Sequence, residues 1–476
     1  MKIIVAKFGG STIGENGKQI PMVINRIKNM KNDKNKIIAV FSAPLTKYDG
    51  KVRSMTDIAI NIGKKYSNSK KLDTSIFEDT YRNIANQYVS KKYLKDFDTS
   101  FAKFNNYVTT SLNNAFENKR FIDVTRSKTL AYSGEITMSY LMDYIMKSNG
   151  IKSDHIEIEK WPIITDDNFE AANFLIDESK RSRDHLLELI MNNDVVSIGG
   201  FIGKTVDGLE TTYERGGSDR TAADIAIILN DLYETEIDFE KDNVVLSADP
   251  KIVKNDLEYV KLLSYNEAKL AGMFGMKILD PIAIKELDDN NCNIPIIITS
   301  IHQPSNFTTI KKMIDTEKNE DNMLIKIITG KRNCAIVRME TISSSHLEAS
   351  LEKDKLYHNF LKLSPYKTDD IEMTRLLFLD AEYVKRNVKH FRAYYPKTEF
   401  VYNRGVVTLI GDKMSKVPKI VSTAGRTVGE NDINILDFDA QEETSRILII
   451  VEDKDDNVAN TVKVIHEQRN KIIRKN

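Results

Sequence analysis

The sequence contains only two cysteines in 476 residues, Cys292 and Cys334. Two thiols can supply neither a disulfide framework nor a zinc site. Reduced thiols, as found in reducing compartments, are the simpler interpretation. The N-terminal apolar run Ile3–Ala6 is too short for the core of a signal peptide, and glycines follow at once. We therefore expect a cytoplasmic protein.

A net charge and a long apolar segment are also absent. Lys plus Arg and Asp plus Glu number 69 each, so the formal net charge is zero. Proteins that bind nucleic acids or membrane surfaces favour a basic excess, and no stretch approaches the ~18 apolar residues needed to span a bilayer. This argues against nucleic-acid and membrane partners. The length indicates two or three domains.

The N-terminal segment reads as a strand–turn–helix–strand unit. An apolar, β-rich run covers Lys2–Ala6, a helical stretch runs from about Gln19 to Met30, and a second apolar strand covers Lys36–Ser42. This order is typical of a βαβ unit, in which the two strands are parallel and buried.

Strand and helix signals continue to alternate along the chain. Residues 66–120 are polar and helical in pattern, which predicts an inserted helical layer. The other predicted helices are Ser127–Ser148 and Ser218–Leu229, and the other predicted strands are Asp194–Phe201, Val244–Ser247 and Asn293–Thr299. The alternation predicts an α/β domain around one large, mostly parallel sheet.

The character of the sequence changes after Ser300. Residues 302–322 are polar and charged, which is typical of a linker or domain edge. The signals that follow are strands at Ala335–Met339, Val406–Ile410 and Arg446–Val451, and a terminal helix at Asn460–Glu467. They predict small α+β modules with antiparallel sheets.

The first motif that carries chemistry is Lys7-Phe8-Gly9-Gly10-Ser11, at the end of the first strand. Two glycines at a strand end let backbone N–H groups approach a phosphate, and a helix N-terminus adds partial positive charge. Lys7 is placed to reach a transferring phosphoryl group. By itself, the motif also fits a plain strand-to-helix turn with a surface lysine.

The second motif, Arg215-Gly216-Gly217-Ser218-Asp219, repeats a glycine pair before a helix. Ser218 and Asp219 stand in capping positions, and Arg215 can hold a carboxylate through two parallel hydrogen bonds. An ordinary helix cap accounts for the serine and the aspartate, but not for an arginine beside two glycines.

Three further turns have similar features. Ser133-Gly134-Glu135 places a glutamate at a helix start, which fits either dipole chemistry or a carboxylate that holds a substrate ammonium. Gly199–Gly203 ends one predicted strand and Ser247–Lys251 follows another. Ligands bind at the ends of parallel strands in α/β sheets. Together these turns favour recognition of a phosphate and an amino acid.

These blocks resemble the signatures of aspartate kinases, within the amino acid kinase superfamily, in their order and approximate spacing. Ser42-Ala43 followed by Thr56-Asp57 is similar to the second loop of that family, and Phe274–Pro281 is similar to its FGAKVLHP block. The tail, especially Val407–Phe438, resembles an ACT module. The resemblance covers nearly the whole chain.

The resemblance implies an architecture for the chain. Residues 1–305 would form an α/β catalytic domain, an amino acid kinase-like three-layer sandwich with a mostly parallel sheet. Residues 324–395 and 396–476 would form two ferredoxin-like α+β ACT modules, the first of them divergent. Such modules often pair through their sheets, so the family-based expectation is a homodimer or tetramer.

The resemblance also implies an activity. ATP, with Mg²⁺, would phosphorylate the side-chain carboxylate of L-aspartate to give 4-phospho-L-aspartate, the first step towards lysine, methionine and threonine. Lys7 and Asp219 would be catalytic, with Lys7 stabilising the transferring phosphoryl group and Asp219 organising the phosphates and the lysine. Aspartate would be held by Thr56, Glu135, Arg215 and Ser218, with Arg215 on the α-carboxylate and Glu135 near the α-ammonium. The nucleotide contacts would come from Lys7, Gly9, Gly10, Ser11, Gly216, Gly217, Lys241, Asp242, Lys251 and Lys277, and no residue is assigned as a metal ligand.

The sequence departs from the family pattern at three places. Lys241-Asp242-Asn243-Val244 stands where the family has D-V-D-G, and Asp280 replaces a usual histidine. The first ACT-like segment lacks the G-x-G-M turn, of which the second keeps Gly411-Asp412-Lys413-Met414. Binding of an amino-acid effector such as lysine or threonine is therefore left open.

Three other functions stay open. A related carboxylate kinase acting on glutamate or N-acetylglutamate would share the first lobe, but not the block at residues 215–219 together with ACT modules. An amino-acid-sensing regulatory protein with a decayed kinase lobe would fit the altered segment at 241–244. A carbamate- or nucleotide-kinase-like enzyme would give Glu135 and Arg215 no role.

Overall fold

The computed structural model describes residues 1–31, 34–64, 72–214, 216–276, 278–312, 323–353, 360–368, 370–412, 414, 417–440 and 444–473. Its contacts divide the chain into two compact units, Met1–Val244 with Ile282–Lys312, and Val245–Pro281 with Met313–Asn476. A segment within the predicted domain 1–305 thus packs with the C-terminal unit. The predicted domain boundaries themselves stay predictions. Among the described helices, none combines the length and apolar character that crossing a membrane requires.

The first unit is built around a mostly parallel sheet, as the sequence predicted. Its strands lie in the order β12-β11-β9-β1-β2-β6-β5. Neighbours from β11 to β5 run parallel, and β12 is antiparallel to β11. The strands are β1 (Lys2–Phe8), β2 (Asn35–Phe41), β5 (Ser153–His155), β6 (Val195–Gly199), β9 (Glu234–Lys241), β11 (Ile296–Ser300) and β12 (Phe307–Lys311).

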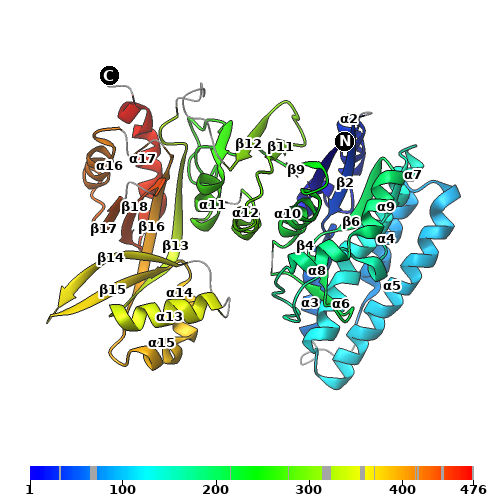
Figure 1. The fold of residues 1–476 in the computed structure, drawn as a ribbon, viewed down its shortest axis with the longest axis horizontal. Helices are drawn as coiled ribbons and strands as arrows, with labels where there is room; N and C mark the ends of the chain where they lie inside the picture. Colours follow the sequence, from blue (N-terminus) through cyan, green and yellow to red (C-terminus); the bar gives the residue numbers. More distant parts are fainter. Residues whose placement is uncertain are drawn as a thin grey trace. The chain divides into compact units, whose positions relative to one another are not determined.

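Helices and two short hairpins complete this unit. The hairpins are β3 (Leu45–Tyr48) with β4 (Lys51–Ser54) and β7 (Ile202–Lys204) with β8 (Glu210–Thr212). The helices are α1 (Gly10–Ile13), α2 (Ile20–Met30), α3 (Met55–Lys64), α4 (Ser75–Tyr88), α5 (Lys91–Asn118), α6 (Asp123–Ala131), α7 (Thr137–Ser148), α8 (Ile176–Arg181), α9 (Asp184–Asn192), α10 (Ser218–Leu229) and α12 (Pro281–Asp289). The inserted layer predicted at residues 66–120 is confirmed from residue 72 onward, because α4 and α5 pack on α7, which itself lies on the sheet (Figure 1). Residues 66–71 lie outside the described part of the chain.

The strand predicted at Val244–Ser247 is wrong, since only an isolated bridge from Leu246 to Tyr259 forms there. The strand that pairs with β1 on the side opposite β2 is β9, eight residues reading ETEIDFEK, which the sequence interpretation missed. Four of its residues are acidic, so it lacks the apolar run expected of a central parallel strand.

Arginine from a neighbouring helix explains why this acidic strand can be buried. Arg26 of α2 donates from Nη2 to Asp238 at 2.9 Å and from Nε to Glu240. Both carboxylates are almost completely buried. Burial raises the pKa of Asp238 to about 6 and that of Glu240 to about 8, although Arg26 acts in the opposite direction. The guanidinium thus offsets part of the cost of placing two acids in the core.

Replacing Arg26 with methionine should lower the free energy of unfolding by about 3–5 kcal/mol, because it leaves two buried carboxylates without their cation. Urea or thermal unfolding measures this loss. The matched control is Lys2→Met, which removes the partly exposed partner of Glu236 on the same strand and should cost about 1 kcal/mol or less. Equal losses of unfolding free energy for the two variants would contradict the stabilising role assigned to the buried pairing of Arg26.

The predicted linker at residues 302–322 is partly wrong. Residues Phe307–Lys311 form β12, the antiparallel strand beside β11, while residues 313–322 lie outside the described part of the chain. Thr308 and Ile310 are buried and Phe307 is exposed. This alternation of inward and outward side chains is the period of a half-buried strand, which the surrounding polar residues obscured.

The second unit contains an antiparallel sheet in the order β14-β15-β13-β16-β18-β17. Its elements are β10 (Leu262–Ser264), α11 (Tyr265–Met273), β13 (Ile327–Glu340), α13 (Thr341–Lys353), β14 (Phe360–Thr368), β15 (Ile371–Phe378), α14 (Ala381–Arg386), α15 (Val388–Tyr394), β16 (Glu399–Ile410), α16 (Ile420–Gly429), β17 (Ile435–Ala440), β18 (Arg446–Glu452) and α17 (Asn457–Ile473). The predicted strands within β13, β16 and β18, and the predicted helix within α17, are confirmed.

Two long strands link two hydrophobic cores in this unit. The two strands are β13 and β16. In one core, the first half of β13 and the second half of β16 pack against α16 and α17. In the other core, the second half of β13 and the first half of β16 pack against α13, α14 and α15. Figure 1 shows the two helix groups beside different parts of the same sheet. The result is two α+β modules that share their central strands.

Candidate functional site

Loops from four neighbouring strands of the first unit meet at one edge of the sheet. The register places Phe8 of β1 opposite Phe41 of β2 and Glu240 of β9, and Phe41 opposite Gly199 of β6. Because these strands are parallel, their carboxyl ends lie together, where α/β sheets bind ligands. The predicted motifs at residues 7–11 and 199–203 both begin at this edge.

A chain of three charged side chains crosses this edge. Lys7 Nζ lies 2.8 Å from Asp219 Oδ1, and Lys241 Nζ lies 3.6 Å from Asp219 Oδ2. The Lys7 side chain is 13% exposed and that of Asp219 10%, so the pair is shielded but reachable. The carboxylate of Asp219 thus orients the ammonium groups of Lys7 and Lys241 at this edge of the sheet.

The capping role predicted for Ser218 and Asp219 is wrong. The N-cap of α10 is Gly217, and no side chain caps the helix there. Ser218 is the first helical residue, and the carboxylate of Asp219 faces the lysines instead of the helix backbone. Serine and aspartate are typical of N-caps, so the sequence pattern alone could not distinguish the two arrangements.

Glu135 is held in a buried position by two donors. Its Oε1 accepts from the backbone N–H of Ala43 at 3.2 Å, and its Oε2 accepts from Thr56 Oγ1 at 3.0 Å. Burial raises the pKa of Glu135 to about 7, while the two hydrogen bonds act in the opposite direction. A nearby cation would stabilise the ionised form of this buried carboxylate, because it would compensate for the lost hydration.

A π-helical turn at Tyr132–Ile136 presents Glu135, and such turns are frequent at functional sites. Tyr81 of α4 donates its hydroxyl to the carbonyl oxygens of Ser133 and Gly134, at 2.9 Å each. Burial, and then the charge of Glu135, raise the pKa of Tyr81, so that it stays a donor. The sequence interpretation missed Tyr81, because its helical spacing from buried Phe77 looks like ordinary core packing.

Glycines bring the loops of the site into contact. A Cβ at Gly199 would lie 2.8 Å from the carbonyl oxygen of Glu135, and a Cβ at Gly200 would lie 2.6 Å from Ser218 Cβ. On the other side, a Cβ at Gly134 would lie 2.4 Å from Thr56 Oγ1. The β6 turn therefore joins the Thr56–Glu135 pair to the start of α10, which carries Asp219.

The other predicted glycines have structural reasons of their own. Gly216 adopts φ +99°, a left-handed conformation that favours glycine, and a Cβ at Gly217 would lie 2.4 Å from Tyr213 Cβ. A Cβ at Gly10 would lie 2.9 Å from the carbonyl oxygen of Ala43, whereas one at Gly9 would lie 3.4 Å from Lys7 Nζ. Gly9 is thus the residue that keeps open the space beside the Lys7 ammonium.

Phe201 carries backbone strain at the same edge. It has φ +72°, which is unusual for an aromatic residue. Its N–H donates to Thr221 Oγ1 at 2.8 Å, and its carbonyl accepts from Tyr213. Strained residues of this kind cluster at ligand sites, where the surrounding structure holds them.

The remaining predicted residues are not all part of this arrangement. Ser11 is exposed in the short helix α1, and Asp242 lies just beyond Lys241 with its carboxylate 3.8 Å from His302. Lys251 belongs to the second unit. Arg215 and Lys277 lie outside the described residues, so their predicted roles stay predictions.

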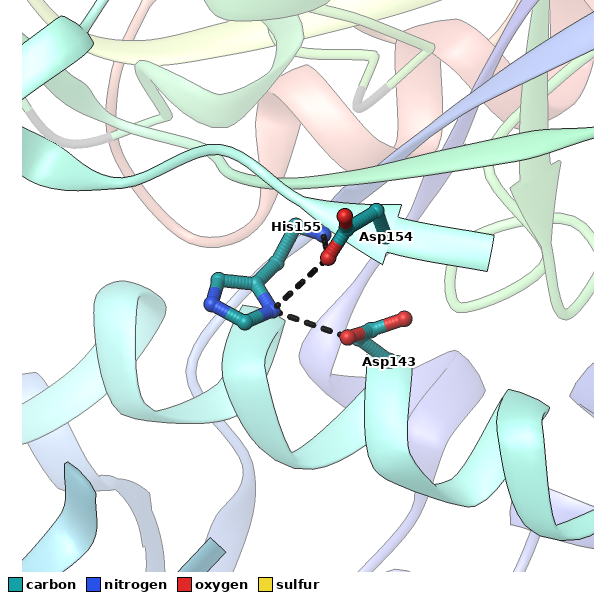
Figure 2. A group of neighbouring side chains, drawn as sticks. All are labelled: Asp143, Asp154 and His155. Carbon is teal, nitrogen blue, oxygen red and sulfur yellow. Dashed lines mark hydrogen bonds and ion pairs between the residues drawn. The ribbon is translucent and has the colours of Figure 1, made fainter. Parts of the chain in front are cut away.

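A separate polar cluster lies on α7 and β5 (Figure 2). His155 Nδ1 is 2.8 Å from Asp143 Oδ2 and 3.7 Å from Asp154 Oδ1. The ammonium of Lys147 contacts the same two carboxylates, at 2.8 and 3.3 Å. The lysine thus supplies the positive charge that a metal ion would otherwise bring, and the cluster ties the edge strand to the helix.

A comparison with known protein families matches residues 2–300 to the amino acid kinase family. The chain belongs to the amino acid kinase family. Among curated relatives, the aspartokinase of Rickettsia felis is 29% identical over 222 residues, which cover 46% of this chain and 52% of that protein. Aspartokinase 1 of Bacillus subtilis is 22% identical over 408 residues, covering 83% of this chain and 96% of that protein.

Solved structures of amino acid kinases have the same fold. Aspartokinase III of Escherichia coli, solved with aspartate and ADP, gives a TM-score of 0.76 at 18% identity and covers 98% of this chain and 99% of that one. The aspartate kinase of Clostridium acetobutylicum gives a TM-score of 0.67 at 20% identity, covering 99% of this chain and 100% of that one. The predicted fold, an amino acid kinase domain followed by ACT-like modules, is confirmed.

Proposed function

We propose that this amino acid kinase is an aspartate kinase, which transfers the γ-phosphoryl group of ATP to the side-chain carboxylate of L-aspartate. The observation that carries the proposal is the placement of Lys7, Asp219 and Lys241 at the same sheet edge as Thr56, Glu135 and Ser218. The two lysines ordered by Asp219 suit the binding of a polyphosphate. The cluster around Glu135 suits the binding of an amino acid. The curated relatives named aspartokinase support this choice of acceptor.

The acceptor needs no general base. A carboxylate is ionised at neutral pH, so it can attack the γ-phosphorus directly. The obstacle is charge, because one anion must approach another. Catalysis then rests on positioning and on cations that neutralise the charge that develops on the transferring group. Lys7, fixed by Asp219 at 2.8 Å, is the described cation best placed for this role.

Mg²⁺ would enter this site with the nucleotide. Hard cations prefer oxygen ligands, and the triphosphate supplies several. Asp219 already faces two lysines, so it fits the role of ordering the phosphate-binding ammonium groups better than that of a metal cage. Bound magnesium would neutralise phosphate charge, while Lys7 and Lys241 hold the phosphates in place.

Aspartate would be recognised at its α-groups. Glu135, buried and held by Thr56 and Ala43, would accept hydrogen bonds from the α-ammonium. Ser218 lies within reach of the β6 turn, and Arg215 would clamp the α-carboxylate through its planar guanidinium. This arrangement leaves the side-chain carboxylate free to face Lys7.

The C-terminal modules would provide regulation. We propose that they bind an amino-acid effector such as lysine or threonine, and that the chain forms a dimer or tetramer through their sheets. E. coli aspartokinase III has been solved with lysine and aspartate in a T-state. Turnover with and without each amino acid, combined with light scattering, tests both parts.

An acceptor panel tests the proposed function. The protein with ATP and Mg²⁺ should form an acyl phosphate, trapped by hydroxylamine as a hydroxamate, with L-aspartate but not with glutamate or N-acetylglutamate. Glutamate has one methylene more than aspartate, and one extra methylene in a fitted site changes specificity by about 10–200-fold. Hydroxamate formation with glutamate alone would favour the related carboxylate kinase. Binding of amino acids without any hydroxamate would favour a regulatory sensor.

A further inference from the structure

The helix α10, which begins with Ser218 and Asp219, is buried along its whole length. Every polar side chain on it therefore needs a partner within the protein. Asp219 has such partners in two lysines. Arg220 and Asp224 stand four residues apart, so they share one face of the helix, and they are 5% and 0% exposed. The proposed reaction gives neither of them a role, although a buried charge is costly unless it is paired.

Arg220 is satisfied by an acid from α12 and by an aromatic ring. Its Nη2 donates to Glu286 Oε1 at 2.6 Å and its Nε to Oε2 at 3.4 Å, so the guanidinium contacts both oxygens of this carboxylate. Its Nη1 donates to the carbonyl oxygen of Ala172 at 3.4 Å. The guanidinium carbon lies 4.1 Å from the centre of the Tyr213 ring, a cation–π contact. Arg220 thus joins α10 to α12, to the loop before α8 and to the residue that follows β8.

Tyr213 connects this network to the start of α10. Its hydroxyl group donates to Asp224 Oδ2, and its backbone N–H donates to the carbonyl oxygen of Phe201 at 3.0 Å. A Cβ at Gly217, the N-cap of α10, would lie 2.4 Å from Tyr213 Cβ. The backbone that carries Asp219, two residues after Gly217, is therefore packed against Tyr213.

The network contains two carboxyl groups, Glu286 and Asp224, but only one guanidinium. Among the described residues, no donor reaches the buried Oδ1 of Asp224. Burial, and then the charge of Glu286, raise the pKa of Asp224 well above its usual range, while Arg220 and the hydroxyl group of Tyr213 act in the opposite direction. A protonated Asp224 can donate to Glu286 and still accept from Tyr213. The network is then neutral as a whole, and each of its polar groups has a partner.

The loop before α10 is poorly suited to fixing the helix start by itself. It contains the pair Gly216-Gly217, and glycine restricts the backbone less than any other residue. An apolar core would also pack against the helix, but a fully satisfied polar network specifies one geometry. Tyr213 contacts the chain both before and after Asp219, so it can fix where that carboxylate lies.

We propose that Tyr213 and Asp224 are positioning residues for phosphoryl transfer. They hold the start of α10 in the place where Asp219 fixes the ammonium group of Lys7, and Arg220 holds them in turn. They act through Asp219 and not on the substrate. The proposal rests on the function proposed above, in which Lys7 stabilises the transferring phosphoryl group.

Tyr213→Phe in the full-length protein is the primary test. It removes the hydroxyl group that donates to Asp224 and keeps the ring that packs against Gly217. We expect kcat for aspartate phosphorylation to fall about tenfold or more, since a misplacement of about 1 Å can cost about 10²-fold in rate. The matched control is Tyr233→Phe, at a partly exposed site just beyond the other end of α10, which should leave kcat unaltered.

A double-mutant cycle separates positioning from a general loss of stability. Because Tyr213 acts through Lys7 in this proposal, Tyr213→Phe should lower kcat by less than about twofold when Lys7→Met is already present, since effects within one unit are not additive. A variant that is only less well folded would lose the same factor in both backgrounds. Equal losses, or an unaltered kcat in Tyr213→Phe alone, would overturn the inference.

Asp224 offers a test by rescue. Asp224→Asn keeps an acceptor for Tyr213 and a donor towards Glu286, so it should retain most of the kcat that Asp224→Leu loses. A loss in Asp224→Asn as large as in Asp224→Leu would contradict the neutral network described above. If Asp224→Leu fails to fold, Tyr213→Phe and its cycle with Lys7→Met still decide the proposal. Absence of acyl phosphate formation by the unaltered protein would overturn the proposed function, and the inference with it.

Discussion

Replacing Lys7 with methionine should lower kcat for aspartate phosphorylation by about 10²–10³-fold, the range seen when one preorganised donor to the transition state is removed. The Lys7 ammonium is fixed by Asp219 at 2.8 Å and lies next to the space that Gly9 leaves open. Its charge is therefore set in place before the reaction, and a neutral side chain of similar length cannot supply it. Steady-state kinetics with saturating ATP and aspartate measures the effect.

The aspartate KM should change little in this variant, because Lys7 faces the transferring group and not the α-groups of the substrate. Lys2→Met provides a control on the same strand, since Lys2 pairs with Glu236 and should leave kcat unaltered. Turnover of Lys7→Met at the rate of the unaltered protein would remove Lys7 from the reaction.

Replacing Glu135 with glutamine should raise the aspartate KM by about 10–100-fold, which corresponds to the ~1.5–3 kcal/mol of a hydrogen bond to a charged group. The amide keeps the size of the side chain and can still accept from Thr56, which donates at 3.0 Å in the native site. It loses the charge that would attract the α-ammonium. The kcat should fall less than the KM rises, and titration calorimetry with aspartate separates binding from turnover.

The same residue predicts a pH dependence. The pKa of Glu135 is raised to about 7, so its carboxylate is charged above that pH and becomes protonated below it. A protonated glutamate cannot pair with the ammonium, so the aspartate KM should rise as the pH falls from about 8 to about 6, a range in which ordinary carboxylates stay ionised. The KM of Glu135→Gln should not vary over this range. A parallel rise in the variant would assign the effect to another group.

Much of this site could be predicted from the sequence because its chemistry follows short motifs. Glycine pairs at strand ends predicted the edge where a phosphate would bind. Lys7 stands two residues before such a pair, and Glu135 follows the single glycine Gly134 at a helix start. In the structure, Gly199 contacts Glu135 and Gly200 contacts Ser218 at the start of α10, whose Asp219 pairs with Lys7. These features depend on neighbouring residues in the chain, which one sequence displays directly.

What could not be predicted depends on long-range partners. The acidic strand β9 is buried with its Asp238 and Glu240 paired to Arg26, more than 200 residues away in the sequence. Tyr81, which fixes the turn carrying Glu135, has the spacing of any core residue on α4. Local patterns carry no information about such contacts, so propensity alone misplaced a strand at Val244–Ser247.

The most direct test of the central claim, that one cationic pocket receives both an acidic amino acid and a nucleoside triphosphate, is a crystal structure with aspartate and a non-hydrolysable ATP analogue. The account predicts the α-ammonium at Glu135 and the side-chain carboxylate between Lys7 and the γ-phosphate. Aspartate bound away from Glu135, or a γ-phosphate that faces neither Lys7 nor Lys241, would contradict it.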